Sequence, residues 1–360
     1  MEKRMIFHIP FKNDKLSGSS IRPTKLLNAF KELGYTVDFV LGYGTERKQS
    51  IKKIKKNIKN GVKYEFLYSE SSTMPTLLTE KNHFPRYPFL DFGFFKFCQK
   101  NGIKIGLFYR DIYWNFPIYS LPYLKKKIAI FCYKYDLKKY NEYVDILFLP
   151  CKKMADYIPK KLKMQIEECY PGSDNELFEY EANEKINMLY VGGTGEYYDY
   201  SLLLNILNKE KFEKKISLII VTRKDEYEKF IKEKNLNLSS NIRVIHGNIN
   251  DLNIKNIDIG LLYMKPVLYR DFAVPLKLFE YIADGLPILA NKNTFVGNFI
   301  EKNNIGWQVD YNEKKLEEFL DKIVENRNII ATKRQEVLKI RENHTWLKRA
   351  EEIAEKMKKA

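Results

Sequence analysis

The chain has 360 residues, of which 44% are hydrophobic and 14% aromatic, a content that excludes a wholly disordered protein. This length favours two domains rather than one. A membrane-spanning helix needs about 18 consecutive apolar residues, and no apolar run in the chain approaches this length. Residues 1–10 contain too few apolar side chains for an export signal. Cys98, Cys132, Cys151 and Cys169 form no C-x-x-C pair, which argues against disulfides and structural zinc. We therefore expect a cytoplasmic protein.

The positive charge is uneven along the chain. Residues 1–180 carry 32 Lys and Arg against 19 Asp and Glu, a net charge of +13, which leaves only +3 of the total of +16 for the remaining residues. The first half is thus expected to meet something acidic, and nucleic acid and an anionic membrane surface are both candidates. A lysine-rich composition that keeps the protein in solution is the plain alternative.

Short β-branched and aromatic runs alternate with helical patterns, which predicts βαβ units on parallel sheets. The predicted strands of the first half are residues 5–9, 37–41, 65–68, 103–109 and 146–149. Those of the second half are residues 188–191, 218–222, 243–246, 257–262, 288–290 and 306–309. A turn that contains Pro and Gly, at residues 170–178, separates the two sets.

The expected fold class is α/β, with two Rossmann-like domains whose parallel sheets face each other across a cleft. We assign residues 1–172 to the first domain, 173–340 to the second, and 341–360 to a C-terminal helix that packs back on the first. Ligands bind such sheets beyond the carboxyl ends of the strands, so functional groups are expected in those loops.

The loop after the first strand, residues 12–23, is polar and leads into a helix that we expect to start at Pro23. Gly18 in this loop allows a ligand to approach the backbone closely. The loop matches neither a P-loop nor G-x-G-x-x-G, so a dinucleotide enzyme has little support. An ordinary surface loop is the alternative.

Arg110 and Asp111 follow the strand at residues 103–109 and precede several aromatic residues. A charged pair at a strand's carboxyl end, beside rings that stack on sugars, suits a carbohydrate cleft and makes both residues catalytic candidates. The alternative is an Arg–Asp bridge beneath an aromatic cluster.

Two basic amphipathic stretches, residues 51–58 and 123–134, lie in the first half. Either is able to lie on anionic lipid headgroups. For one stretch alone, a crossover helix with solvated lysines is the simpler interpretation, but both together in one domain favour a membrane surface.

Gly193 and Thr194 follow the first strand of the second half and precede a helix expected near Tyr198, a place where backbone N–H groups face a phosphate. Arg223 and Lys224 directly follow the next strand, so they place two positive charges at the carboxyl edge of the sheet.

The segment from Pro275 to Pro287 is the most specific in the chain. Pro275 suits the first helical position, and Gly285 is expected to end the helix. Lys277 and Glu280 lie on one face near the helix start, where a diphosphate binds well and a carboxylate is free to accept ribose hydroxyls. An ordinary amphipathic helix with a solvated Lys–Glu pair is the alternative.

Sequence motifs of several common active sites are absent. The chain contains no D-x-D and no H-E-x-x-H, so no metal site is predicted. It also contains no G-x-S-x-G motif, so a serine hydrolase is not predicted.

With these motifs the chain resembles the GT-B glycosyltransferases, most closely the retaining family 4 type, or glycosyl transferases group 1, of bacterial surface polysaccharide synthesis. The resemblance covers nearly the whole chain. It rests on the Ser17-Gly-Ser-Ser sequence, residues 33–40, residues 171–178 with Phe178, the pair Gly192 and Gly193, and residues 275–288.

The resemblance implies a metal-independent, hexosyltransferase-type enzyme that needs no cofactor besides its UDP- or GDP-linked nucleotide sugar. The second domain binds this donor, and the implied donor-binding residues are Gly18, Gly193, Thr194, Arg223, Lys224, Val274, Pro275, Lys277 and Glu280. The first domain takes a lipid-linked or polysaccharide acceptor of capsule, exopolysaccharide or lipopolysaccharide synthesis. It implies peripheral attachment to the inner face of the cytoplasmic membrane and no nucleic-acid partner.

The sequence departs from the family pattern at three places. Phe272 stands where the first acid of Glu-x7-Glu is usual, and Arg110 stands where many members carry histidine. The usual Arg and Lys are absent near Gly193, so Arg223, Lys224 or Lys277 must take their place. Two other functions remain open: a basic nucleic-acid-binding protein, and a GT-B-like protein that binds partners without catalysis.

Overall fold

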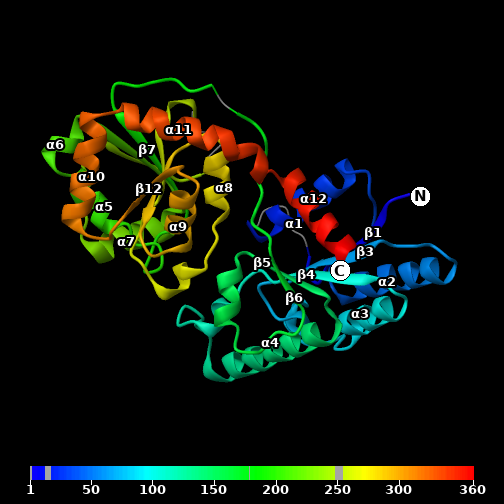
Figure 1. The fold of residues 1–360 in the computed structure, drawn as a ribbon. Helices are drawn as coiled ribbons and strands as arrows, with labels where there is room; N and C mark the ends of the chain where they lie inside the picture. The colour runs from blue at the N-terminus through cyan, green and yellow to red at the C-terminus, as the bar shows by residue number, and fades with distance from the viewer. Residues whose placement is uncertain (1, 13–17, 178, 248–253) are drawn as a thin grey trace. The chain divides into compact units, whose positions relative to one another are not determined.

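The computed structural model describes residues 2–12, 18–177, 179–247 and 254–360, and the chain divides into two compact units (Figure 1). Unit 1 comprises Met1–Gly172 and Trp346–Ala360, and unit 2 comprises Ser173–Thr345. Each unit contains one six-stranded sheet in which all paired strands are parallel.

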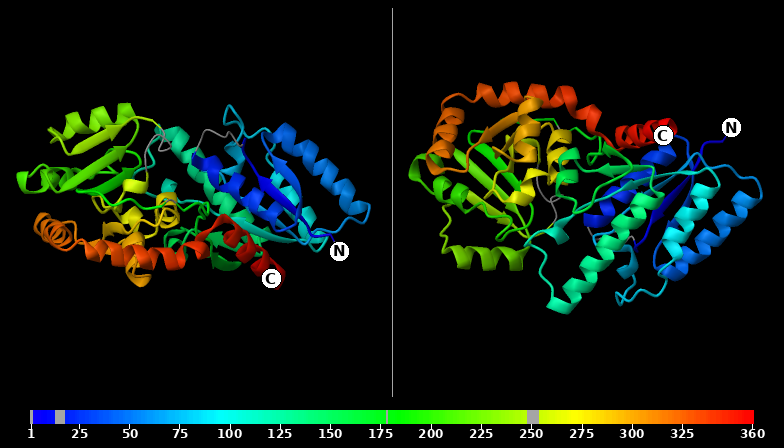
Figure 2. Two further views of the ribbon diagram at one scale, coloured as in Figure 1. Left: turned by 90° about the horizontal axis from the view of Figure 1, so that it is seen from above. Right: turned by 60° about the horizontal axis from the view of Figure 1, so that its bottom comes forward.

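The sheet of unit 1 has the strand order β2-β1-β3-β4-β5-β6. The layer of α2, α3 and α4 covers one face, and α1 and α12 cover the other (Figures 1 and 2). The strands are β1 (Arg4–Ile9), β2 (Thr36–Leu41), β3 (Phe66–Glu70), β4 (Lys104–Phe108), β5 (Ile146–Leu149) and β6 (Gln165–Glu168). The helices are α1 (Gly18–Glu32), α2 (Gly44–Lys59), α3 (Leu90–Lys100), α4 (Tyr123–Tyr143) and α12 (Trp346–Lys359), with 3-10 turns η1 (Thr76–Leu78), η2 (Tyr113–Asn115) and η3 (Lys152–Tyr157).

The sheet of unit 2 has the order β12-β11-β10-β7-β8-β9. Contacts join α5 to α6 and α10 in one group and α8 to α11 in another. The strands are β7 (Ile186–Val191), β8 (Ile216–Val221), β9 (Ile242–Ile245), β10 (Ile259–Leu262), β11 (Ile288–Asn291) and β12 (Gly306–Val309). The helices are α5 (Ser201–Leu207), α6 (Glu210–Glu213), α7 (Lys224–Lys234), α8 (Leu276–Ala283), α9 (Phe295–Lys302), α10 (Glu313–Glu325) and α11 (Asn328–Ile340), with 3-10 turns η5 (Ile254–Asn256), η6 (Leu268–Asp271) and η7 (Arg341–His344).

All eleven strands predicted from the sequence are confirmed, and no end differs from the prediction by more than two residues. The twelfth strand, β6, was not predicted. It lies at the edge of its sheet, and its four residues include two glutamates and no fully buried side chain, so it lacks the apolar pattern of the other strands.

The start of α1 differs from the prediction. The helix begins at Gly18, five residues before Pro23, and Pro23 lies inside it. Pro23 is the sixth residue of this helix, where a proline costs one helical hydrogen bond. The buried side chains that follow it, Leu26, Ala29 and Phe30, offset this loss. Ser17 and the rest of residues 13–17 lie outside the described residues, as does Phe178.

A buried polar network supports the core of unit 1. His8 lies within hydrogen-bond distance of Ser69 through Nδ1 (2.8 Å) and of Asp91 through Nε2 (2.9 Å), and Arg47 donates to both oxygens of Asp91. Burial lowers the pKa of His8, although Asp91 opposes this shift. The order Ser–His–Asp resembles a nucleophile with its base, but all three side chains are buried, so the network joins β1, β3, α2 and α3 rather than meeting a substrate.

The C-terminal helix α12 packs on α1 and β4 within unit 1. Its buried face contains Ala350, Ile353, Ala354 and Met357, and a Cβ atom at Gly106 of β4 would lie 2.5 Å from the Met357 sulfur. Leu347, near the start of the helix, is only partly buried.

Candidate functional site

In the sheet of unit 2, the order in which the chain adds strands reverses between β7 and β10. From β7 the chain adds strands outward through β8 to β9, and it then returns to β10 and continues to β12 on the other side. In parallel sheets such a switch point leaves a crevice at the carboxyl ends of the two strands. Here the crevice is bordered by the glycine-rich loop after Val191 and by the loop between β10 and α8.

A cavity of about 470 Å³ lies at this edge of the sheet. It brings together three of the predicted donor-binding residues, Gly193, Arg223 and Lys277. Its lining residues are Val191, Gly192, Gly193, Val221, Thr222, Arg223, Gly247 and Lys277. The cavity therefore combines exposed backbone, which approaches a ligand closely at glycine, with two positive side chains.

Helix α8 begins at Leu276, one residue later than predicted, because Pro275 has an extended ψ of 144° and forms the N-cap. The helix ends at Ala283, and Gly285 follows with a φ of +70°, as its position at the helix end predicted. The apolar side of α8 is buried in unit 2. Lys277 and Glu280 lie on the other side and form an ion pair with each other.

The cations of the cavity already have carboxylate partners. Arg223 pairs with Glu226 at 2.5 Å, and the same carboxylate accepts the backbone N–H of Thr194 at 3.4 Å. Lys224 starts α7 and pairs with Glu228 at 3.8 Å, and it is absent from the cavity lining. Each of the predicted phosphate-binding side chains must therefore break its ion pair with a carboxylate before it can bind a phosphate.

Asp284 adds a titrating group below Glu280. Burial raises the pKa of Asp284 to about 7, and the charge of Glu280 adds to the shift, whereas Lys277 and Arg341 oppose it. The charge at the C-terminal end of α8 therefore changes near neutral pH.

The helix expected near Tyr198 begins later, at Ser201. The carboxylate of Asp199 accepts both the backbone N–H (3.0 Å) and the hydroxyl (2.6 Å) of Ser201, and Lys234 pairs with Asp199. An acidic side chain already occupies the start of α5. A phosphate at the loop after β7 would therefore have to bind to the backbone of the glycines instead.

The carboxyl edge of the unit 1 sheet contains a buried charge cluster. Glu70 ends β3 and is fully buried. Its carboxylate accepts hydrogen bonds from Arg22 Nε at 2.9 Å and from Arg110 Nη2 at 3.3 Å. The guanidinium of Arg22 also lies over the ring of Phe108. Two arginines around one glutamate leave a net positive charge at the switch point between β1 and β3.

The sequence predicted Arg110 and Asp111 at this edge but missed Glu70 and Arg22. Arg110 pairs with Glu70, and Asp111 accepts the backbone N–H of Tyr113 at 2.9 Å. Burial lowers the pKa of Arg110, and Glu70 opposes this shift. Glu70 could have been found from the sequence, because it is an acidic residue just after a predicted strand. No sequence signal pointed to Arg22, because α1 was expected to begin after it.

Three other positions that the sequence singled out can be located in the structure. Gly18 is the first residue of α1 in unit 1. Phe272, at the position of the usual first acid, is buried and packs edge-on against Tyr269 with 5.1 Å between ring centroids. Val274 directly precedes Pro275 and is partly exposed.

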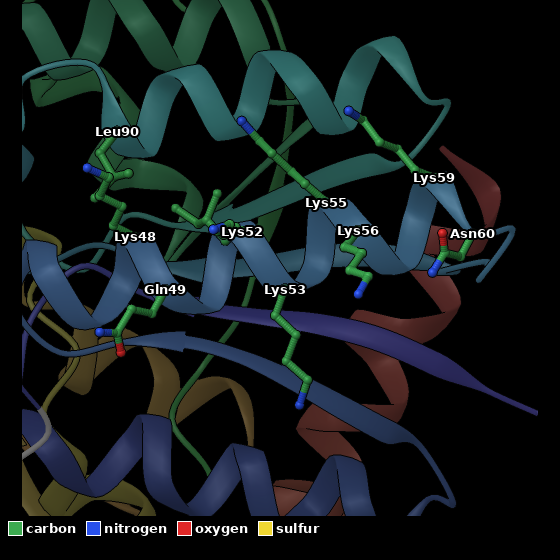
Figure 3. Close-up of a pocket in the computed structure, with 10 residues that line it drawn as sticks. Lys48, Gln49, Lys52, Lys53, Lys55, Lys56, Lys59, Asn60 and Leu90 are labelled. Atoms are coloured by element: carbon green, nitrogen blue, oxygen red, sulfur yellow. The ribbon is translucent and has the colours of Figure 1, made fainter.

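The layer of α2, α3 and α4 in unit 1 carries a lysine-lined hollow of about 910 Å³ along α2 (Figure 3). Six lysines line it, and none of them forms an ion pair with a described residue: Lys48, Lys52, Lys53, Lys55, Lys56 and Lys59. Lys55 and Lys59 extend toward α3, and Lys53 extends to the opposite side of α2 (Figure 3).

Helix α4 of the same layer exposes a set of large apolar side chains. Leu124 is 72% exposed and Phe131 69%, and Tyr123 and Ile128 are also exposed. A cavity of about 620 Å³ beside them is lined in part by Leu121, Lys125 and Ile128. None of the described helices has both the length and the apolar character needed to cross a bilayer, and the described residues hold no cluster of three or more potential metal ligands.

No protein-family model and no curated protein matches the chain. Solved structures share its fold. Anabaena HepE, in complex with UDP-glucose, is 11% identical with a TM-score of 0.64, over 99% of this chain and 100% of that chain. A glycosyltransferase from Rickettsia africae is 15% identical with a TM-score of 0.64, over 100% and 99% of the two chains. WaaG, a glycosyltransferase involved in lipopolysaccharide biosynthesis, is 12% identical with a TM-score of 0.56, over 99% and 100%. The predicted GT-B fold is confirmed.

Proposed function

We propose that the protein is a glycosyltransferase that moves a sugar from a UDP- or GDP-linked donor to a lipid-linked or polysaccharide acceptor. One observation carries this proposal: a cavity at the switch point of unit 2 joins the Gly193 backbone, Arg223 and Lys277, beside Glu280 on α8. These are groups that bind a diphosphate and a ribose, and they occur in a GT-B fold. Two of the structural neighbours, HepE and an α-glucosyltransferase, were solved with UDP.

In this proposal the donor diphosphate lies at the start of α8, where free N–H groups and the helix dipole favour an anion. Lys277 turns from Glu280 to the phosphates, and the released carboxylate of Glu280 accepts the ribose hydroxyls. The ion pair thereby separates into two groups that each bind a part of the donor.

Transfer breaks the bond between the sugar and the diphosphate and forms a bond between the sugar and an acceptor hydroxyl oxygen, whose proton passes to the departing diphosphate; negative charge builds up on that diphosphate as the bond breaks. Lys277, Arg223 and the start of α8 stabilise that charge, so we propose a metal-independent reaction of the retaining, hexosyltransferase type. Arg110 remains charged and has no lone pair, so it acts as an electrostatic partner and not as a base. Asp111 is the remaining acidic candidate of the predicted catalytic pair.

The acceptor side is proposed to meet an anionic membrane surface through the α2–α4 layer of unit 1. Exposed apolar side chains on α4 enter the interface between headgroups and acyl chains, and lysines of α2 and α4 contact anionic headgroups, each contributing about 1 kcal/mol. The cavity beside Ile128 and Leu121 gives the apolar part of a lipid-linked acceptor a place to bind. We therefore propose that the enzyme acts at the inner face of the cytoplasmic membrane, in capsule, exopolysaccharide or lipopolysaccharide synthesis.

Donor binding is tested by thermal unfolding with millimolar UDP or GDP, because a ligand that binds only the folded state raises the melting temperature. A screen of nucleotide sugars for slow hydrolysis then identifies the donor. Absence of both a melting shift and hydrolysis for every nucleotide sugar would remove the basis of the proposal. Binding without transfer to any glycan or lipid acceptor would leave a GT-B-like binding protein.

Membrane binding is tested by sedimentation with phosphatidylglycerol vesicles and with neutral phosphatidylcholine vesicles. Wild-type protein is expected to bind the anionic vesicles, and the double variant Leu124→Ser, Phe131→Ser to lose most of this binding. Leu177→Ser, an exposed leucine of unit 2, is the matched control. Salt-dependent retention on RNA without vesicle binding would favour the nucleic-acid alternative.

A further inference from the structure

Arg270 links the two loops that border the switch point of unit 2. It lies in η6, between β10 and α8, and its Nη2 group donates a hydrogen bond to the carbonyl of Tyr197 in the loop after β7. Its guanidinium also lies over the ring of Tyr198, 5.3 Å from the centroid. A single side chain thus spans the crevice in which ligands of parallel sheets bind.

This arginine lacks the acidic partner that the other cations of the site have. Its Nε atom is buried without a hydrogen-bond partner, and it forms no ion pair with a carboxylate of the described chain. The titratable groups that act on it are three tyrosines: Tyr198, Tyr190 and Tyr269. Burial lowers the pKa of Arg270, yet a guanidinium stays protonated in proteins, so the charge remains.

The surroundings place this charge beside the cavity. The Tyr198 ring contacts Gly193, since a Cβ atom at Gly193 would lie 3.6 Å from Tyr198 Cδ2. The hydroxyl of Tyr190 donates to the Gly193 carbonyl at 2.7 Å. Arg270 is therefore separated from the cavity-lining glycine by one aromatic ring, and that ring is partly exposed.

Burying a cation that has an unused N–H group and no counter-charge costs free energy, and an anionic ligand relieves this cost. Lys277 and Arg223 each have to give up a carboxylate before they bind a phosphate. Arg270 has none to give up.

We propose that Arg270 is the principal anion-binding residue of this site and contacts the diphosphate of the donor. The inference rests on the proposed function for the identity of the ligand, a nucleoside diphosphate. It goes beyond the residues predicted from the sequence, which were Arg223, Lys224 and Lys277. A guanidinium presents several N–H donors in one plane, so it is suited to holding two phosphate oxygens at once.

The test is calorimetric titration of wild type, Arg270→Gln and Arg270→Lys with UDP, with uridine and with inorganic pyrophosphate. Loss of a charge-assisted contact is expected to weaken UDP binding by about tenfold or more in Arg270→Gln. Uridine binding is expected to stay unchanged, pyrophosphate binding to be lost, and Arg270→Lys to fall between the two. Arg243→Gln, an exposed arginine of β9, is the matched control and should bind all three ligands as wild type does.

Each outcome separates the two proposals. Equal losses for UDP and uridine, together with a lower melting temperature without ligand, would assign Arg270 a purely structural role and overturn the inference. UDP binding that is unchanged in Arg270→Gln would overturn it while leaving the proposed function intact. A wild type that binds pyrophosphate through Arg270 but no nucleotide would keep the anion site and overturn the proposed function. A wild type that binds neither would overturn both.

Discussion

Lys277 and Glu280 form an ion pair one turn apart on α8, at the border of the unit 2 cavity. The pair is partly exposed, so its own contribution to stability is small. Its consequence is functional, because a diphosphate and a ribose must compete with it. The carboxylate thus holds the lysine in place until a ligand replaces it.

Replacement of Glu280 by alanine should abolish the rise in melting temperature produced by UDP or GDP, because the ribose loses its acceptor. Loss of a hydrogen bond to a charged group corresponds to about 1.5–3 kcal/mol of binding free energy. Glu318→Ala is the matched control, since Glu318 pairs with Lys315 at the same helical spacing on α10. An equal nucleotide shift in Glu280→Ala and wild type would contradict the ribose role.

Replacement of Glu70 by glutamine should strongly destabilise unit 1. The change leaves Arg22 and Arg110 beside each other without their shared carboxylate, and breaking a buried ion pair costs about 3–5 kcal/mol. Urea unfolding measures the loss. Glu142→Gln removes the partner of an ion pair with Lys139 on α4 and should change the free energy of unfolding by less than about 1 kcal/mol. Similar losses in the two variants would show that the cluster is unimportant for stability.

Stability should fall as pH rises toward neutrality because of Asp136. Burial raises the pKa of this carboxyl to about 7. The hydrogen bond from the backbone N–H of Thr76 opposes this rise. The folded protein therefore holds this proton more tightly than the unfolded chain does, so the stabilisation is full at low pH and is lost as pH passes through about 7.

Asp136→Asn keeps the acceptor for Thr76 without the charge, so we expect it to be more stable than wild type at pH 8. The difference should shrink at pH 5, as measured by urea unfolding at both values. Asp225→Asn, in the first turn of α7, is the control and should show no such pH-dependent gain. A constant difference between Asp136→Asn and wild type across this range would show that Asp136 is not titrating there.

Replacement of Gly306 by alanine should destabilise unit 2. A Cβ atom at this position of β12 would lie 2.0 Å from the carbonyl oxygen of Ile288 on the paired strand β11, so the backbone must shift. Such overpacking costs about 1–3 kcal/mol or more. Gly93→Ala is the contrasting control: nothing lies within 4 Å of its Cβ position in α3, and the change should stabilise that helix by about 0.5–1 kcal/mol. Thermal unfolding of both variants checks the opposite signs.

The order of the elements could be read from the sequence because it depends on local patterns. Apolar runs such as residues 146–149 mark buried strands, and Gly285 and Pro287 mark where α8 must stop. The polar edge strand β6 escaped for the same reason, since two glutamates give no apolar signal. The start of α1 escaped because Pro23 is a local stop signal that packing overrode.

The identity of the charges that act together was decided only by the tertiary structure. Arg110 was expected beside Asp111, but the fold pairs it with Glu70, 40 residues earlier in the chain, because β3 and β4 are neighbours in the sheet. Arg270 likewise meets Tyr197 only because β7 and β10 adjoin at the switch point. Composition and spacing thus determined the fold and the residues of α8, whereas long-range strand order determined which cations are neutralised and which remain available to a ligand.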